Sequence, residues 1–376
     1  MLVPKNALPS IKQFKEGKAK ILASFAQTPT KALDVFYNPN SSVQRDITIS
    51  LLKSLNRKLL IADPLAGSGV RAIRFLLEAP KAVKSVLIND KNPKAFEVIK
   101  KNLKLNKIKV NKKVKLFCRD ANLVLRELKP FDYIDIDPFG SPNSWLDSAM
   151  VALSKKGILA ITATDTAALA GTAPRACLRK YWAWPLKCYL MHEIGIRILI
   201  RKVQLIGLQY EKFLTPIYSH MGKGYYRIYF LNKKGKLENI TNNHGLFYFC
   251  FNCLKFGISA CCNRAKQAGP LWLGAIWMPD LADNIYKNAV FEALNLSKII
   301  ADESRIQTIG FYDIATLCSK LKIAMPSFKK IFYDLKNFGF KVARSSFLSS
   351  GIRSDAPIES LIDILKKGSA NVNYLS

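Results

Sequence analysis

The sequence contains no long apolar run, no internal repeat and no low-complexity tract. No stretch reaches the roughly 18 consecutive apolar residues that a membrane-spanning helix requires, and residues 1–5 lack the apolar core of a signal peptide. We therefore expect a cytoplasmic protein with no membrane partner, and we find no sign of an obligate protein partner. In that compartment the eight cysteines would be reduced or bound to a metal.

Acidic residues are also scarce. The chain of 376 residues has 58 Lys and Arg but only 27 Asp and Glu, which gives a formal net charge of +31. Such an excess destabilises a compact state by self-repulsion, and its simplest explanation is a polyanionic partner, RNA or DNA before a membrane surface. The length predicts two domains, and a hydrophobic content of 49% is ample for buried cores.

A complete dinucleotide-binding fingerprint is missing as well. A short apolar run at 59–63 leads into a turn at 64–69 that contains Gly67, and residues 70–78 then have helical periodicity. A strand, a glycine-bearing turn and a helix let the backbone approach a nucleotide-like ligand. Because the third glycine of the fingerprint is absent, a pyrophosphate is disfavoured, and a nicotinamide-dependent dehydrogenase is the weaker alternative. A cofactor with an adenosine but no pyrophosphate, S-adenosylmethionine, fits better.

What the sequence does contain is a row of acids that close successive predicted strands. Strands are predicted at 59–63, 86–89, 114–119 and 131–136, and the acids that close them are Asp63, Asp90, Asp120 and Asp137. Taken singly, each aspartate is more typical of a helix N-cap than of a ligand. Together they indicate a binding edge, because open parallel sheets bind ligands at the carboxyl ends of their strands. Asp90 would accept both ribose hydroxyls, and Asp120 with Ala121 would meet the adenine edge.

The fourth of these strands runs directly into Asp137, Pro138 and Phe139. An exocyclic amine of a nucleobase is a poor nucleophile, because its lone pair is delocalised into the ring, so methylating it requires acceptors for its protons. The Asp137 carboxylate and the Pro138 carbonyl can act as these acceptors, and Phe139 offers a face on which a flipped base could stack. An Asp-Pro turn after a strand is also common without any such function.

The order of the predicted elements indicates an α/β fold. An irregular segment and a helix from near Ser41 precede alternating strands and helices over 59–164, which predict a parallel sheet. Helices dominate 175–208, and a hairpin at 213–220 and 225–231 would close the sheet with antiparallel strands. The linker 232–236 marks the expected boundary between two domains, 1–232 and 233–376. The first would be a Rossmann-like class I methyltransferase domain and the second a smaller α+β domain.

The second domain contains a group of four cysteines. Cys250 and Cys253 have the spacing of a zinc knuckle, and Cys261 and Cys262 follow a short loop later. A regular site would show a second Cys-x-x-Cys pair, whereas here the two later cysteines are adjacent and would have to bend sharply to bind one ion. Zinc binding and buried free thiols both remain open, with His244 as a weak substitute ligand.

The last third of the chain resembles a winged helix. Two amphipathic segments at 311–320 and 327–337 are followed by a basic strand at 340–347. This order would direct basic side chains toward nucleic acid; they are Lys329, Lys330, Lys336, Arg344 and Arg353. The alternative is a solvated charged face on an ordinary helical bundle.

Taken as a whole, the sequence resembles the tRNA (guanine(26)-N2)-dimethyltransferases. The most specific matching strings are Asp-Pro-Phe-Gly-Ser-Pro at 137–142 and Arg-Ala-Cys-Leu-Arg-Lys-Tyr at 175–181. Further matching segments are spread over nearly the whole chain, at 35–40, 44–46, 63–75, 162–165, 192–195 and 269–274. The cysteine group departs from the family pattern, which bears on metal binding and not on the catalytic domain.

This resemblance implies a role for individual residues. It assigns tRNA as substrate and S-adenosylmethionine as cofactor, with contacts from Arg45, Arg71, Asp90, Asp120 and Ala121. The two arginines would lie near the cofactor carboxylate. Asp137 would be the catalytic acceptor, and Phe36 would help to hold the guanine. The residues alone leave two alternatives open: an amino-methyltransferase that acts on another RNA or DNA base, and a non-catalytic RNA-binding protein.

Overall fold

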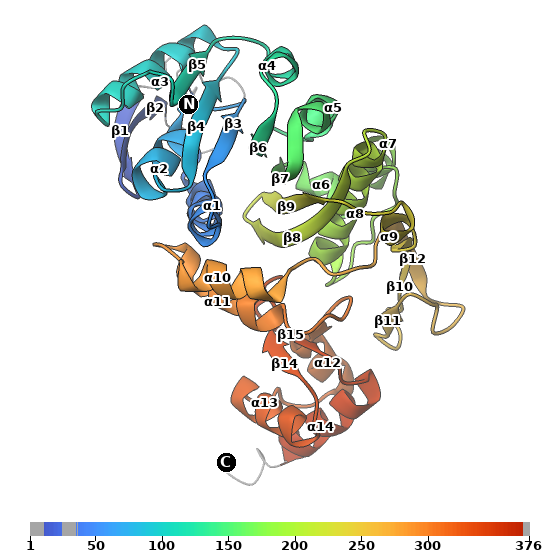
Figure 1. Ribbon diagram of the computed structural model, residues 1–376. Helices are drawn as coiled ribbons and strands as arrows, with labels where there is room; N and C mark the ends of the chain where they lie inside the picture. Colours follow the sequence, from blue (N-terminus) through green and yellow to red (C-terminus); the bar gives the residue numbers. More distant parts are fainter. Residues whose placement is uncertain (1–10, 25–34, 36, 371–376) are drawn as a thin grey trace, which may run out of the picture.

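The structure is a computed structural model, and it describes residues 11–24, 35 and 37–370. Its centre is a seven-stranded sheet with strand order β5-β4-β3-β6-β7-β9-β8 (Figure 1). The strands are β3 (Leu59–Asp63), β4 (Val83–Asn89), β5 (Val114–Phe117), β6 (Phe131–Ile136), β7 (Leu153–Ala163), β8 (Phe213–Gly222) and β9 (Tyr225–Lys233). The first five pair in parallel, and the hairpin of β8 and β9 adds two antiparallel strands at the edge. The expected α/β class and the expected closing hairpin are therefore confirmed.

Helices connect the strands and pack around the sheet (Figure 1). They are η1 (Pro39–Ser41), α1 (Ser42–Ser54), α2 (Val70–Glu78), α3 (Pro93–Leu105), α4 (Ala121–Glu127), α5 (Asn143–Ala152), α6 (Thr166–Leu169), α7 (Pro174–Tyr181) and α8 (Met191–Leu208). The inner strands read as near-continuous apolar runs because both of their faces are covered. In β6 and β7, for example, Ile134, Ile136 and Ile161 have no exposed surface.

A short hairpin precedes the sheet, and the expectation of an irregular N-terminal segment is wrong there. β1 (Ile11–Glu16) and β2 (Ala19–Ser24) pair in register across a two-residue turn, in which Gly17 takes a φ of +54°. The hairpin is fixed to the sheet domain by a buried carboxylate: Glu16 accepts from Arg45 at 2.6 Å and from Arg74 at 2.8 Å. Glycine in such a turn was the available signal.

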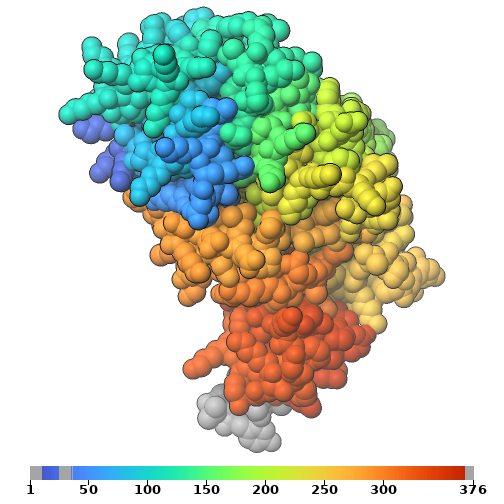
Figure 2. All heavy atoms as spheres, in the orientation of Figure 1, coloured from blue at the N-terminus to red at the C-terminus, as the bar shows by residue number. Residues whose placement is uncertain are grey.

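The rest of the chain builds two small sheets and a helical lobe. One sheet consists of β10 (His244–Phe249), β11 (Phe256–Gly257) and β12 (Lys266–Trp272); the other consists of β13 (Tyr312–Asp313), β14 (Val342–Arg344) and β15 (Gly351–Ser354). The helices are α9 (Glu238–Thr241), α10 (Pro279–Lys287), α11 (Ala293–Glu303), α12 (Ile314–Leu321), α13 (Phe328–Asn337) and α14 (Ile358–Ala370). The order of α12, α13 and the β14–β15 hairpin matches the expected winged-helix-like part. Figure 2 shows the C-terminal residues, in red, as a lobe that projects from the rest of the molecule.

Arg353 does not face nucleic acid, and this expectation is wrong. It has no exposed surface and donates to Glu193 on α8 at 2.7 Å and to Glu303 on α11 at 3.0 Å. Its remaining donors reach the carbonyls of Thr308 and Gly310. A guanidinium buried this deeply must be fully paired, because an uncompensated buried charge costs several kcal/mol. Arg353 therefore joins the C-terminal lobe to α8.

The structure also bears on the membrane question. Among the described residues, no helix is both long and apolar enough to cross a bilayer.

Candidate functional site

The carboxyl ends of β3, β4, β5 and β6 lie along one edge of the sheet, as the row of acids predicts. Asn89, the last residue of β4, joins the loop after β3 to the loop after β5. Its amide nitrogen donates to the carbonyl of Pro64 at 3.0 Å and to that of Arg119 at 2.9 Å, and its oxygen accepts from the Arg119 amide at 3.1 Å. A buried asparagine at a strand end was a sequence signal for this role, and sequence reasoning missed it.

Asp90 is oriented by the backbone on both sides. Its Oδ2 accepts from the amide of Gly67 at 2.8 Å, and its Oδ1 accepts from that of Asn92 at 2.9 Å. The helix cap that follows is Asn92, whose side chain accepts from Lys94, so Asp90 is not the N-cap of α3. Burial raises the pKa of Asp90, while the two amide donors lower it. Each carboxylate oxygen keeps a further lone pair for a ligand hydroxyl.

Asp120 and Ala121 occupy different environments. Asp120 is exposed and caps α4, because its side chain accepts from the Asn122 amide at 2.9 Å. Ala121 is buried at the first position of that helix. For Asp120 the structure thus shows the capping role, and the bonds from Asn89 to Arg119 hold the adjoining loop at the same edge.

The turn after β3 has the shape that its glycines allow. Gly67 and Gly69 have φ values of +56° and +76°, in the left-handed region that other residues avoid. Asp63, at the end of β3, is buried, and its Oδ2 has no hydrogen-bond partner among the described residues. Burial, followed by the charges of Asp135 and the neighbouring acids, raises the pKa of Asp63 to about 8. An unpaired buried oxygen of this kind is costly unless a ligand supplies its partner.

Asp137 is held by a buried arginine. Arg71, in the first turn of α2, donates through Nη2 to Asp137 Oδ2, and its Nε lies 3.5 Å from Oδ1 of Asp135. The Asp137 side chain retains 27% of its exposure, whereas that of Arg71 retains 5%. One side of the carboxylate is thus anchored, and the other is accessible.

A second arginine, Arg227, pairs with Asp135 beside the Arg71–Asp137 pair. Arg227 on β9 forms a forked ion pair with Asp135, at 2.9 and 2.6 Å, and also bonds Thr162 at 2.8 Å. Gln44 links the two arginines, because it donates to Thr162 at 2.7 Å and accepts from Arg71 at 3.1 Å. Sequence reasoning assigned no role to Asp135, Arg227 and Gln44, which lie far apart in the chain, although Gln44 belongs to the matching segment 44–46 and Asp135 to the strand before Asp137.

The loop after Asp137 is fixed by its neighbour in the sheet. The Gly140 amide donates to Thr164 Oγ1 at 2.6 Å, and the Thr164 amide donates back to the Gly140 carbonyl at 2.9 Å. Pro138 is buried, and Phe139 is 37% exposed. Phe36, expected to hold the guanine, lies outside the described residues.

Arg45 is placed differently from Arg71. It is buried, and its Nε and Nη2 form a forked pair with Glu16 at 2.6 and 2.5 Å, while Nη2 also bonds the Asn38 carbonyl at 2.9 Å. The structure therefore gives Arg45 a role in fixing the N-terminal hairpin. Its expected contact with a cofactor remains a prediction.

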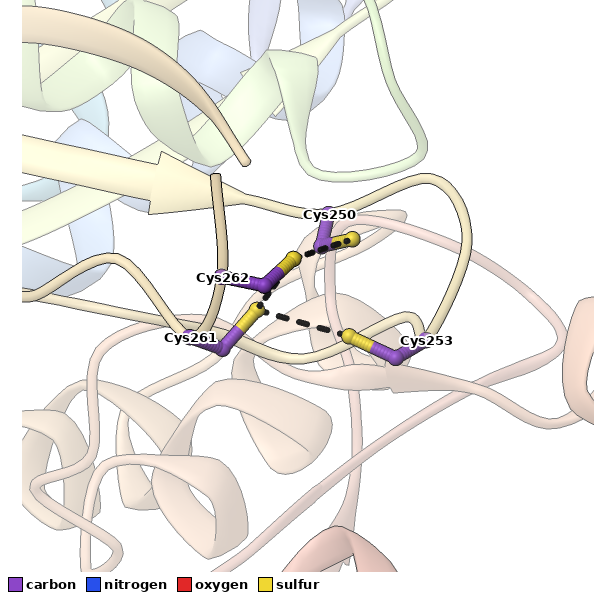
Figure 3. Close-up of side chains that lie close together, drawn as sticks. All are labelled: Cys250, Cys253, Cys261 and Cys262. Carbon is purple, nitrogen blue, oxygen red and sulfur yellow. Dashed lines mark hydrogen bonds between the residues drawn. The ribbon is translucent and has the colours of Figure 1, made fainter. Parts of the chain in front are cut away.

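The four cysteines come together at the end of β10 (Figure 3). All four sulfur atoms lie within 4.8 Å of one another, and three separations are 3.4, 3.6 and 3.8 Å. These exceed the roughly 2.05 Å of a disulfide. A zinc–sulfur distance of about 2.3 Å implies tetrahedral edges of about 3.8 Å, so the cluster has the dimensions of a four-thiolate site. The adjacent Cys261 and Cys262 do bend toward one centre.

The pKa values of two cysteines in the cluster move in opposite directions. A backbone amide of Cys253, directed at the sulfur of Cys250, lowers the pKa of Cys250 to about 6, whereas burial and the neighbouring thiols raise the pKa of Cys261 to about 12. His244 is not a substitute ligand, because its Nε2 pairs with Gln204 at 2.9 Å and it lies at the opposite end of β10 from Cys250.

Comparison with known proteins places this geometry in context. A family model described as N2,N2-dimethylguanosine tRNA methyltransferase matches residues 17–366. A tRNA (guanine(26)-N(2)/guanine(27)-N(2))-dimethyltransferase of Aquifex aeolicus is 35% identical, over 94% of this chain and 94% of the relative. A tRNA (guanine(26)-N(2))-dimethyltransferase of Pyrococcus abyssi is 34% identical, over 93% and 97%. The structure of Trm1 from Pyrococcus horikoshii with S-adenosyl-L-methionine superposes with a TM-score of 0.83 at 33% identity, covering 94% of this chain and all of that one.

Proposed function

This chain belongs to the N2,N2-dimethylguanosine tRNA methyltransferase family, and on that premise we propose that it transfers one or two methyl groups from S-adenosylmethionine to the exocyclic N2 of guanine 26 in tRNA. The observation that supports this most directly is the accessible side of Asp137, anchored by Arg71 and followed by the half-exposed ring of Phe139. Mass spectrometry of nucleosides from unmodified tRNA, incubated with the protein and S-adenosylmethionine, tests it. The same spectra distinguish mono- from dimethylated product and reveal a modified neighbouring guanine.

The cofactor would occupy the edge formed by Asp63, Gly67, Asp90 and Asp120. The donor set fits it: Asp90 retains lone pairs for ribose hydroxyls, and the unpaired Oδ2 of Asp63 can bond a ligand donor. Ala121 would pack against the adenine, and Arg45 and Arg71 would balance the cofactor carboxylate. When bound, S-adenosylmethionine supplies an electrophilic methyl group.

The chemistry required of the protein is positioning and proton acceptance. A guanine swung out of the tRNA core would stack between Phe36 and Phe139, at an unstacking cost of a few kcal/mol that phosphate contacts offset. Its N2 would donate to Asp137 and to the Pro138 carbonyl, and Asp137 would take the proton released as the carbon–nitrogen bond forms. No covalent link to the enzyme is needed, so catalysis rests on orientation and charge complementarity.

Replacing Asp137 with alanine should slow methyl transfer by roughly a hundredfold or more, the usual scale for a positioned acid or base. Cofactor binding should persist, because Arg71 keeps its second partner Asp135. Asp132→Asn is the matched control, since Asp132 lies at the other end of β6 and bonds the Leu60 amide. Near-normal turnover of the Asp137 variant would remove this residue from the mechanism.

Asp90→Asn should weaken S-adenosylmethionine binding by about 1.5–3 kcal/mol, the range for hydrogen bonds to a charged group. Asparagine keeps one acceptor for the backbone amides of Gly67 and Asn92, so the turn should survive better than with alanine. Titration calorimetry measures the affinity, and the exposed Glu97→Gln on α3 is the control. An unchanged affinity for S-adenosylmethionine would show that Asp90 stabilises the turn and does not bind the cofactor.

We also propose that the four cysteines bind one zinc ion, which would join β10 to the loop before β12. The purified protein should then contain about one equivalent of zinc by mass spectrometry. Cys253→Ser should lose it, whereas Cys118→Ser, outside the cluster, should not. Iron in place of zinc would contradict the proposed metal, since a four-thiolate site accepts either. A metal-free wild-type protein would contradict the site itself.

We propose that residues 1–232 form the catalytic domain. Residues 233–376 would bind the tRNA body through its phosphates. On α13 the exposed cations are Lys329 and Lys336, whereas Lys330 pairs with Asp334 at 2.9 Å. Arg344 stacks over the ring of Phe328 at 3.5 Å and donates to the Ser349 carbonyl. The structure thus reduces the expected basic surface to fewer available side chains.

Changing Lys329 and Lys336 to alanine should weaken tRNA binding and flatten its salt dependence by about one counterion per lost contact. Affinity for S-adenosylmethionine should stay unchanged. The exposed pair Lys101 and Lys104 on α3, changed in the same way, is the control. Filter binding across a salt series measures the slope of tRNA affinity against salt concentration. A slope equal to that of the wild type would show that these lysines belong to an ordinary solvated face.

A further inference from the structure

A segment beside residues 137–142, the catalytic loop of the proposed function, combines positive charge with exposed indole rings. Residues 166–192 contain no Asp or Glu, and they carry four cations: Arg175, Arg179, Lys180 and Lys187. The same segment holds two of the five tryptophans, Trp182 and Trp184, which are 45% and 46% exposed. Tryptophan is usually well buried, so two exposed tryptophans within three residues, in a segment without acidic residues, require an explanation.

The backbones of both tryptophans are held by hydrogen bonds. Trp182 ends α7 in the left-handed conformation, at φ +58°, which is strained for a bulky residue. The ammonium of Lys202 lies 2.9 Å from the centroid of its ring. The Trp184 backbone is paired with Gly269, through hydrogen bonds of 2.8 and 2.7 Å, so this residue is fixed to the rest of the molecule. Rings presented by a fixed backbone lose little entropy when they bind a partner.

This surface adjoins the catalytic loop. Asn143, which follows that loop, donates to the Lys180 carbonyl at 2.8 Å. Asp165, directly after Thr164, accepts from Lys180 at 2.9 Å and from the Tyr181 hydroxyl at 2.5 Å. Figure 1 shows α7 lying beside α8 at this side of the sheet. The charge of Lys180 is therefore paired with Asp165. Arg175 and Arg179 are exposed, one helical turn apart.

We propose that Arg175, Arg179, Trp182 and Trp184 form a docking surface for the substrate tRNA, a role that rests on the proposed function. The arginines would bind phosphates, and an indole would stack on a base that loses its neighbour when the target guanine leaves the tRNA core. Charge complementarity favours RNA over a protein partner. The segment has cations for the phosphates and no acidic residues to repel them, and its indole rings can stack on bases. The surface would thus stabilise the opened tRNA at the place where the base is extracted.

The test compares three variants: Trp182→Ala with Trp184→Ala, the same pair changed to Phe, and Arg175→Ala with Arg179→Ala. Steady-state methylation of unmodified tRNA should show a KM for tRNA raised about tenfold or more in both alanine variants, the scale of losing a stacked base or two phosphate contacts. The kcat at saturating tRNA and the calorimetric affinity for S-adenosylmethionine should change little. The phenylalanine variant should recover most of the loss, and tRNA should quench the indole fluorescence of the wild type.

Controls separate the ways in which this could fail. Lys109→Ala with Lys112→Ala removes two exposed cations from the loop before β5, at the opposite edge of the sheet, and should leave the KM unchanged. An unchanged KM for tRNA in the alanine variants overturns the docking surface. So does a tryptophan variant that keeps the wild-type KM but sediments differently in the absence of tRNA, because the indoles would then belong to a contact between protein molecules. The arginine variant keeps the test valid if loss of both indoles impairs folding, because its changes lie on an exposed helix face. A wild type that methylates no tRNA would refute the proposed function, whereas an active wild type with unaffected variants would refute only this surface.

Discussion

The site depends on one electrostatic constraint, the pairing of Arg71 with two acids at the carboxyl end of β6, Asp135 and Asp137. Side chains of a strand alternate between its faces, so Tyr133 and Asp135 of β6 lie on one face, and Asp137, directly after the strand, continues the alternation. Two carboxylates two residues apart repel each other unless cations lie between them. Arg71 contacts both, and Arg227 completes the pairing of Asp135, whose pKa stays below its usual value despite burial because of these arginines. Removing Arg227 would leave the fully buried Asp135 with Arg71 at 3.5 Å as its remaining cation, and breaking a buried pair of this kind costs about 3–5 kcal/mol.

The same arrangement recurs at two places where distant parts of the chain join. Glu16 brings the N-terminal hairpin to α1 and α2 through Arg45 and Arg74, and Glu193 brings α8 to the C-terminal lobe through Arg353. In each case a buried arginine has its donors paired by carboxylates, which compensates its loss of hydration. The net positive charge of the chain therefore does not extend to these buried sites, where carboxylates neutralise the arginines.

These pairings also mark the limit of what the sequence can predict. The strand at 59–63 and the helix at 70–78 have the bounds that their apolar pattern and glycine turn indicate, because both signals are local. The position of Arg353 could not be predicted in that way. Its partner Glu193 lies 160 residues away, and a basic residue after a predicted strand looks the same in the sequence whether it meets RNA or a buried acid. The four cysteines fall between these cases, since their grouping is local but the bend that brings Cys261 and Cys262 to one centre is not visible in the spacing.

The order of the strands explains why two separate sets of residues meet at one place. From β3 the chain proceeds outward to β4 and β5, whereas β6 returns to the other side of β3, so the connections diverge between β3 and β6. Ligands of open α/β sheets bind in the crevice at such a divergence. Asp63 and Asp90 lie on one side of it and Asp137 on the other, and Arg71 reaches across because it begins the helix that follows the β3 turn. The proposed cofactor site at the first set therefore faces Asp137, the proposed proton acceptor, across this crevice.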